Sequence, residues 1–393
     1  MKSESSMIYD TTATLSPWIS SPLAQRAAEQ LDHSADVIET AIRIQQIAAP
    51  TFSEGARAEA VRQLMLEYGL ADVDVDAIGN VYGRVPGREP QGGLLIAAHM
   101  DTVFPAATDL AIRREGQRIY GPGLGDNSLG VAALLHLGKA LIAQQIVPAH
   151  DLWLVADVGE EGLGDLRGMR AAVGRLRGSI RRAIALEGTG HDRIVHEAIG
   201  VRRYRITAKA PGGHSWQNFG APSAIHSLVR LAERLTHLEL PKAHSSYNIG
   251  VIEGGTSINA IAEHASLLLD LRSVESDALG HLIRQAERIV ATAQAAEPQV
   301  TISAEVVGDR PAGRIGHDHP LVRLAQAAYK AVGTTTSSGV GSTDANIPLS
   351  MGIPAVCIGV TDGANAHRLD EYIETTRVGQ GMRALLWLAL AAS

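Results

Sequence analysis

The strongest constraint on the fold is a set of four short, fully apolar runs distributed along the chain. They are Leu94–Ala98, Leu152–Ala156, Ala183–Leu186 and Ala355–Val360. Runs of this length without a polar residue are typical of parallel strands that are buried on both faces. Helical spacing of apolar residues occurs between them, notably over residues 129–144 and 321–332. This alternation predicts an α/β sheet with helices on both faces.

A second arrangement of elements occupies residues 198–307. Strand-like segments at 201–208, 247–252, 265–271 and 300–306 alternate with helical stretches at 221–237 and 275–293. The order β-α-β-β-α-β matches a ferredoxin-like α+β module. The α/β pattern resumes afterwards, and a chain of 393 residues exceeds the usual size of one core. We therefore predict that residues 198–307 are inserted into a domain made of residues 1–197 and 308–393.

Further helices are expected at 23–46, 54–68 and 375–391, and a hairpin at 71–86. The amino-terminal residues contain no apolar stretch of the kind found in signal peptides, and no run approaches the ~20 apolar residues of a membrane span. The net charge is −7, and there is no long run of Lys or Arg to bind nucleic acid or an anionic membrane. We expect a soluble cytoplasmic protein whose first fifteen residues are loose.

The cysteine content restricts the metal chemistry. Cys357 is the only cysteine, and it lies in an apolar run, so a buried thiol is expected. Disulfides within the chain and thiolate zinc sites are both excluded. Any bound metal must therefore be held by His, Asp and Glu.

Residues of these types follow each of the four apolar runs. A Gly-rich segment, Gly121–Gly125, also delivers an aspartate just before a helix. The residues concerned are His99, Asp101, Asp126, Glu160, Glu161, Glu187 and His367. Because ligands of open α/β sheets bind at the carboxyl ends of the strands, we expect these side chains to gather at one edge.

So many buried carboxylates would be costly without cations, since each would otherwise have to take up a proton. Divalent metal removes that cost, and imidazole with carboxylate ligands favours Zn²⁺, with Co²⁺ or Mn²⁺ as alternatives. Taken singly, each element has an ordinary explanation: a His-x-Asp pair arises by chance, and Glu160-Glu161 alone is typical of a solvated loop. Their joint position at four strand ends favours a metal site.

At these residues the sequence resembles the metallopeptidase family that contains carboxypeptidase G, aminoacylase, acetylornithine deacetylase, succinyl-diaminopimelate desuccinylase and peptidase T. The resemblance extends from about residue 35 to about residue 390. It is carried, in family order, by His99–Val103, GPGLGDN, Glu160-Glu161, Glu187-Gly188, Gly212-Gly213-His214-Ser215, Gly341-Ser342-Thr343-Asp344 and Ala366-His367. It implies a zinc-exopeptidase-like mixed sheet with flanking helices and an inserted lid and dimerisation domain.

The resemblance also implies a ligand set for two metal ions. His99 and Glu187 would bind one ion, Glu161 and His367 the other, and Asp126 would bridge them. The Asp126–Asn127 link would be the cis peptide seen in relatives.

The same resemblance implies two roles next to the metals. Asp101 would orient His99, as metal-bound imidazoles generally require. Glu160 would be the general base that takes a proton from the water between the ions.

Substrate-contacting roles follow in the same way. His214, of the same or the partner subunit, would stabilise the tetrahedral oxyanion. Asn259 and Arg272 would bind a free carboxylate of the substrate, for which a guanidinium is well suited. Ser342 and Thr343 would line the same pocket. The partners implied are a small peptide or N-acyl amino acid and a second copy of the chain.

The chain departs from the family pattern near Asp126. Many relatives carry Asp-x-Lys-Gly-Gly where this chain has Asp126-Asn127-Ser128-Leu129-Gly130. Glu187 resembles the acylase and carboxypeptidase branches, whereas the Ser-Thr-Asp-Ala-Asn run from Ser342 is closer to peptidase T. The subfamily is therefore open on sequence grounds.

Other functional classes fit the sequence less well. No Gly-x-Ser-x-Gly elbow follows a strand, which argues against a serine hydrolase. The glycines at 121, 123 and 125 lack the last glycine of a dinucleotide fingerprint and lead into Asp126. The alternative outside catalysis is a catalytically silent relative that binds a peptide or amino-acid derivative. The prediction is a di-zinc hydrolase that cleaves an amide bond.

Overall fold

The structure, a computed structural model, describes residues 11–241 and 244–393. The chain forms two compact units, which we call unit 1 and unit 2. Unit 1 comprises the residues up to Glu197 together with Arg314–Ser393, and unit 2 comprises Ala198–Gly313. The sequence-based boundary at 307/308 falls inside the last long strand of unit 2, β14 (Thr301–Arg310).

Unit 1 is built on a nine-stranded sheet with the order β1-β2-β6-β3-β7-β17-β8-β15, in which β16 pairs with β8. Its strands are β1 (Ala71–Val75), β2 (Val81–Val85), β3 (Glu89–His99), β6 (His150–Asp157), β7 (Ile180–Thr189), β8 (Arg193–Ala198), β15 (Gly313–Arg314), β16 (Ser337–Gly341) and β17 (Ala355–Thr361). The neighbours β6, β3, β7 and β17 run parallel to one another. They contain the four apolar runs, so the predicted α/β class is confirmed.

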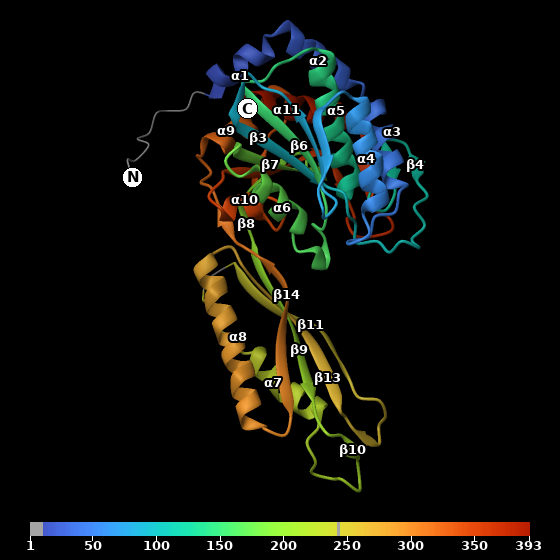
Figure 1. The fold of residues 1–393 in the computed structure, drawn as a ribbon, viewed down its shortest axis with the longest axis vertical. Coiled ribbons are helices and arrows are strands. Elements are labelled where there is room, and N and C mark those ends of the chain that lie inside the picture. The colour runs from blue at the N-terminus through green and yellow to red at the C-terminus, as the bar shows by residue number, and fades with distance from the viewer. Residues whose placement is uncertain (1–10, 242–243) are drawn as a thin grey trace, which may run out of the picture. The chain divides into compact units, whose positions relative to one another are not determined.

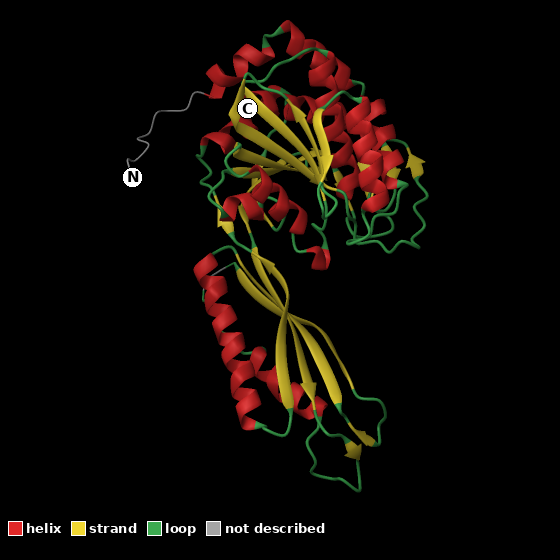
Figure 2. Cartoon of the chain, viewed as in Figure 1, coloured by secondary structure: helices red, strands yellow, loops and turns green. Residues whose placement is uncertain are grey.

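Helices surround this sheet (Figures 1 and 2). They are α1 (Thr11–Ile19), α2 (Pro22–Asp32), α3 (Ser34–Gln45), α4 (Gly55–Glu67), α5 (Leu129–Ala143), α6 (Arg167–Leu176), α9 (Pro320–Ala331), α10 (Asn346–Ser350) and α11 (Val378–Ala392). The single helix predicted at 23–46 is two helices that meet at His33, whose ψ of 65° is not helical. Of the fifteen amino-terminal residues predicted to be loose, 1–10 lie outside the described residues. The prediction is wrong from Thr11 on, because α1 forms there and buries Leu15 in the core.

A small four-stranded sheet with the order β18-β19-β5-β4 completes unit 1. Its strands are β4 (Arg113–Glu115), β5 (Arg118–Tyr120), β18 (Gly363–Ala364) and β19 (Tyr372–Glu374). The antiparallel register pairs Tyr120 with Tyr372. The Gly-rich segment that follows β5 is therefore brought next to the residues that precede β19.

Unit 2 has the predicted ferredoxin-like order: β9 (Gly200–Lys209), α7 (Ala224–Leu235), β11 (Ser245–Gly254), β13 (His264–Ser273), α8 (Ser276–Ala296) and β14. The four strands are antiparallel in the order β11-β13-β9-β14. Alternate residues of β13, such as Leu267 and Leu269, pack with α7 and α8 in a separate core. A two-stranded sheet pairs β10 (Gly213–His214) with β12 (Ala260–Ile261).

Two further expectations concern single features of the chain. Cys357 lies on β17 and is buried, as predicted. Within the described ranges, no helix combines the length and the hydropathy that a membrane span requires. The expected cytoplasmic location stays a prediction.

Candidate metal centre

The parallel strands of unit 1 bring ligand-type side chains to one edge of the sheet. His99 is the last residue of β3, and Glu187 lies near the end of β7. Their register pairs Ala97 with Ala185, so His99 and Glu187, two residues further along, reach the same level of adjacent strands. Glu160-Glu161 follow β6, and His367 follows β17.

Two groups of ligand atoms result, and they share one residue. His99, Asp126 and Glu187 form one group, and Asp126, Glu161 and His367 form the other; the atoms of each group lie within 4.8 Å of one another. Nε2 of His99 lies 3.2 Å from Oδ1 of Asp126 and 3.5 Å from Oε2 of Glu187. Nε2 of His367 lies 3.1 Å from Oδ2 of Asp126 and 2.9 Å from Oε1 of Glu161. The two oxygens of Asp126 thus face different groups.

The carboxylates of this site shift the pKa values of its two histidines. Burial opposes protonation of His99, yet the carboxylates of Glu187, Asp101 and Asp126 raise its pKa well above the ordinary value. Hydrogen bonds to Asp126 and Glu161 raise the pKa of His367 to about 10. Burial alone would raise the pKa of Asp126, but the two imidazoles lower it. The carboxylates of Asp126, Glu161 and Glu187, together with the two imidazoles, are a donor set that divalent metal ions fit.

The backbone of the Gly-rich segment packs closely against β7, and this packing positions Asp126. Gly123 adopts a φ of 71°, and the Asp126–Asn127 peptide is cis, as the family resemblance implied. A Cβ at Gly188 of β7 would meet the backbone oxygen of Gly125 at 2.3 Å, so only glycine permits this contact. Ser128, near the position of the lysine found in many relatives, is buried and donates a 2.6 Å hydrogen bond to the backbone oxygen of Gly123.

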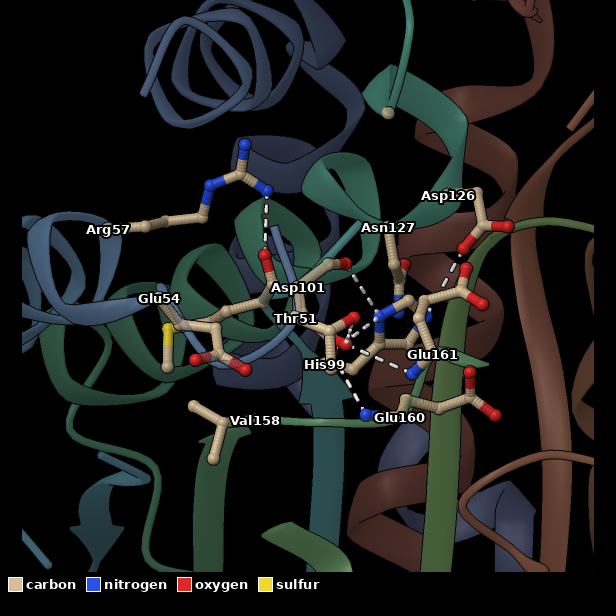
Figure 3. A network of polar contacts seen from close by, with 12 residues as sticks. Thr51, Glu54, Arg57, His99, Asp101, Asp126, Asn127, Val158, Glu160 and Glu161 are labelled. Carbon is tan, nitrogen blue, oxygen red and sulfur yellow. Dashed lines mark hydrogen bonds and ion pairs between the residues drawn. The ribbon is translucent and has the colours of Figure 1, made fainter. Parts of the chain in front are cut away.

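Asp101 holds the loop that carries the two glutamates (Figure 3). Its buried carboxylate accepts the backbone N–H of Glu160 at 2.9 Å and that of Glu161 at 3.0 Å. The hydroxyl of Thr51 donates a third hydrogen bond at 2.8 Å. Nδ1 of His99 lies 3.1 Å from the backbone oxygen of Asp101 and 3.6 Å from its carboxylate. Figure 3 shows both glutamate side chains extending away from this carboxylate.

Replacing Asp101 by asparagine is expected to lower metal affinity and turnover by about 10- to 100-fold, the usual cost of losing a partner of a metal ligand. An amide offers one acceptor oxygen and places an NH₂ against backbone N–H groups, so Glu160 and Glu161 would shift. Zinc affinity by chelator competition and kcat check this. Thr51→Val removes a single donor to the same carboxylate and should have a smaller effect. Equal zinc affinity and equal kcat in Asp101→Asn and the unmodified protein would contradict the expectation.

Sequence reasoning missed two buried carboxyl groups beside the site. Asp157 ends β6 in register with His99, and Asp344 follows β16. Burial raises the pKa of Asp157 to about 7, and burial together with Asp157 raises that of Asp344 well above the ordinary value. Asp157 could have been found, because it directly follows the run Leu152–Ala156. Asp344 stands within the family-like Gly341–Asp344 segment, but the sequence pattern alone indicates no role for it.

The residues with implied substrate contacts lie in both units. Ser342 and Thr343 belong to unit 1, and the oxygen Oγ1 of Thr343 accepts the backbone N–H of Ala345. In unit 2, β10 and β12 place His214 beside Ala260, and Nδ1 of His214 accepts the N–H of Trp216 at 3.2 Å.

Asn259 and Arg272 are also in unit 2. Asn259 is exposed and accepts a 2.7 Å hydrogen bond from the hydroxyl of Ser257. Arg272 lies on β13, where Nε and Nη2 donate to the carboxylate of Asp270 at 2.8 and 3.2 Å.

Comparison with known proteins identifies a family whose members resemble this chain in sequence. A model of peptidase family M20/M25/M40 matches residues 95–391. A putative succinyl-diaminopimelate desuccinylase of Mycobacterium tuberculosis is 25% identical over 354 residues, covering 87% of this chain and 95% of the relative. Carboxypeptidase G2 of a Pseudomonas species is 25% identical over 292 residues, covering 70% and 68%.

Solved structures show the same fold. A tripeptidase of Staphylococcus aureus superposes with a TM-score of 0.77 at 21% identity, covering 92% of this chain and 99% of that chain. The aminopeptidase PepT of Bacillus cereus gives a TM-score of 0.75 at 20% identity, with the same coverage.

Proposed function

The chain belongs to peptidase family M20/M25/M40, a family of metal-dependent hydrolases, and on this premise we propose that it is a two-metal hydrolase of an amide bond. The observation that carries the proposal is the sharing of Asp126 by two groups of His, Asp and Glu ligands. A carboxylate with one oxygen toward each group is what a bridge between two ions requires. Zn²⁺ is the proposed ion, because the ligands are imidazole and carboxylate without thiolate.

The proposed chemistry joins water to the carbonyl carbon and breaks the C–N bond. Bound ions would lower the pKa of water to about 7 and polarise the carbonyl group. Glu160 would accept the proton of the attacking water and return it to the leaving nitrogen. Its neighbour Glu161 belongs to a ligand group, and Asp101 holds the backbone of both. His214 would donate a hydrogen bond to the developing oxyanion.

The proposed substrate is a small peptide or N-acyl amino acid with a free carboxylate, in contact with Arg272, Asn259, Ser342 and Thr343. Asp270 occupies two of the five N–H groups of the Arg272 guanidinium, which leaves donors for a second carboxylate. The names of the relatives support this class, since they include a desuccinylase, a carboxypeptidase and a tripeptidase.

Arg272→Ala is expected to raise KM for a carboxylate substrate by about 10- to 100-fold, with kcat little changed, because a charged hydrogen bond made in both ground and transition states is lost. The same substrate with its carboxylate converted to an amide should be cleaved equally by both proteins. Arg203→Ala is the matched control, since Arg203 contacts the same Asp270. An unchanged KM in Arg272→Ala would contradict the carboxylate contact.

We also propose a homodimer formed through unit 2. β11 is an edge strand of its sheet, and Val251 and Ile252 on it are 45% and 55% exposed. Exposed apolar edges are usually covered in stable proteins. Sedimentation equilibrium should give twice the chain mass, and Ile252→Lys should shift it toward the monomer. A monomeric unmodified protein would contradict the dimer.

The function is tested by amine release from a matched panel, using zinc- or cobalt-loaded protein. The panel contains free tripeptides, N-acyl amino acids and C-terminal glutamate or aspartate conjugates. Cleavage of tripeptides that requires a free amino terminus would identify a peptidase T-like activity. Cleavage of N-acylated substrates would identify an acylase or carboxypeptidase. No turnover of any panel member by protein that holds two ions would contradict the proposed substrate class.

A further inference from the structure

A buried glutamate outside both ligand groups contacts the segment that carries Asp126. Glu371 is 1% exposed and precedes β19. Its Oε1 accepts the backbone N–H groups of Gly125 at 2.7 Å and Asp126 at 2.9 Å. Its Oε2 accepts that of Gly123 at 3.1 Å, and its backbone oxygen accepts that of Gly121 at 2.9 Å.

The converging N–H groups form an anion-binding concavity of the kind called a nest. In phosphate-binding loops such groups contact a ligand, but here a carboxylate of the same chain occupies them. This occupancy argues against nucleotide binding by the glycines at 121, 123 and 125. Burial raises the pKa of Glu371 to about 7, while the backbone N–H donors act in the opposite direction.

Glu371 also belongs to the segment that carries His367. Its backbone N–H donates to the oxygen of Arg368, the residue after His367, at 3.1 Å. Its side chain therefore joins the segments that carry Asp126 and His367, two members of the group Asp126, Glu161 and His367. A Cβ at Gly125 would lie 2.8 Å from Cγ2 of Thr189 and 3.3 Å from Oε1 of Glu371, so the backbone is closely confined there.

We propose that Glu371 is a positioning residue for metal binding, holding the Gly-rich segment so that Asp126 reaches both ligand groups. The inference rests on the proposed two-metal function. Because Asp126 is shared, loss of the Glu371 contacts should weaken both metal sites together. Loss of a residue that supports a ligand of only one ion would instead weaken one site alone.

The test measures zinc binding without substrate, in the full-length protein. Zinc stoichiometry and affinity are determined by chelator competition for the unmodified protein, Glu371→Ala, Glu371→Gln and Asp370→Asn. Glu371→Ala should lose about 10- to 100-fold in affinity at both sites. Glu371→Gln should lose less, because its amide oxygen can still accept the N–H groups of Gly125 and Asp126. Asp370 is exposed and pairs with Arg368, so Asp370→Asn should bind zinc normally.

The visible spectrum of the cobalt-loaded proteins provides a second readout. It should change in both Glu371 variants and stay unchanged in Asp370→Asn. If Glu371→Ala does not fold, Glu371→Gln carries the test, and normal affinity at both sites in that variant would then overturn the proposal. Normal zinc affinity in folded Glu371→Ala, or a loss at one site only, would overturn the proposal and leave the proposed function intact. An unmodified protein that binds no zinc would overturn both.

Discussion

Glu160→Gln is expected to bind two metal ions as the unmodified protein does and to lose about 10²- to 10⁴-fold in kcat, the range that general acid–base catalysis contributes. Glutamine matches glutamate in size, and the backbone N–H that Asp101 accepts is retained. Its amide cannot take up the proton of an attacking water. Metal content by elemental analysis and turnover under substrate saturation check the two halves of the prediction.

Glu161→Gln is the matched comparison, because the neighbouring side chain belongs to a ligand group. It should bind less metal at the site shared with His367. Loss of turnover with full metal content in Glu160→Gln, and loss of metal in Glu161→Gln, would assign proton transfer to Glu160 and metal binding to Glu161. Turnover of Glu160→Gln close to that of the unmodified protein would contradict the assignment of the general base.

Asp126→Ala is expected to abolish activity by removing both metal ions. Its two carboxylate oxygens face different imidazoles, that of His99 and that of His367, at 3.2 and 3.1 Å. Loss of an outer partner of a ligand costs up to about 100-fold in affinity, and loss of a shared direct ligand should exceed this at both sites. Zinc titration monitored by chelator competition provides the measurement.

Glu187→Ala provides the control for Asp126→Ala, since Glu187 belongs only to the group that contains His99. It should weaken one site and leave the other able to bind zinc. Asp126→Ala that loses only one ion would contradict the bridging role. Melting temperatures of the metal-free proteins show whether either substitution unfolds the chain.

The fold and the grouping of the ligand-type side chains could be predicted because both follow from short-range patterns. Four apolar runs identify the parallel strands, and parallel strands end at one edge of a sheet. His99, Glu161, Glu187 and His367 therefore come together although they are spread over most of the chain. The inserted unit was predictable from the order of its strands and helices.

The supporting contacts were not predictable, because they join segments without a shared pattern. Glu371 contacts Asp126 across 245 positions of sequence, and Thr51 contacts Asp101 across 50. Neither residue follows an apolar run or lies in a recognisable motif. The short helix α1 was missed because the burial of Leu15 depends on tertiary packing.

The most direct test of the two-metal account is zinc-edge anomalous diffraction from crystals of zinc-loaded protein. The account predicts two peaks about 3.5–4 Å apart, the usual separation in two-metal sites. One should lie among His99, Asp126 and Glu187, and the other among Asp126, Glu161 and His367. A single peak, or peaks that do not share Asp126, would contradict it.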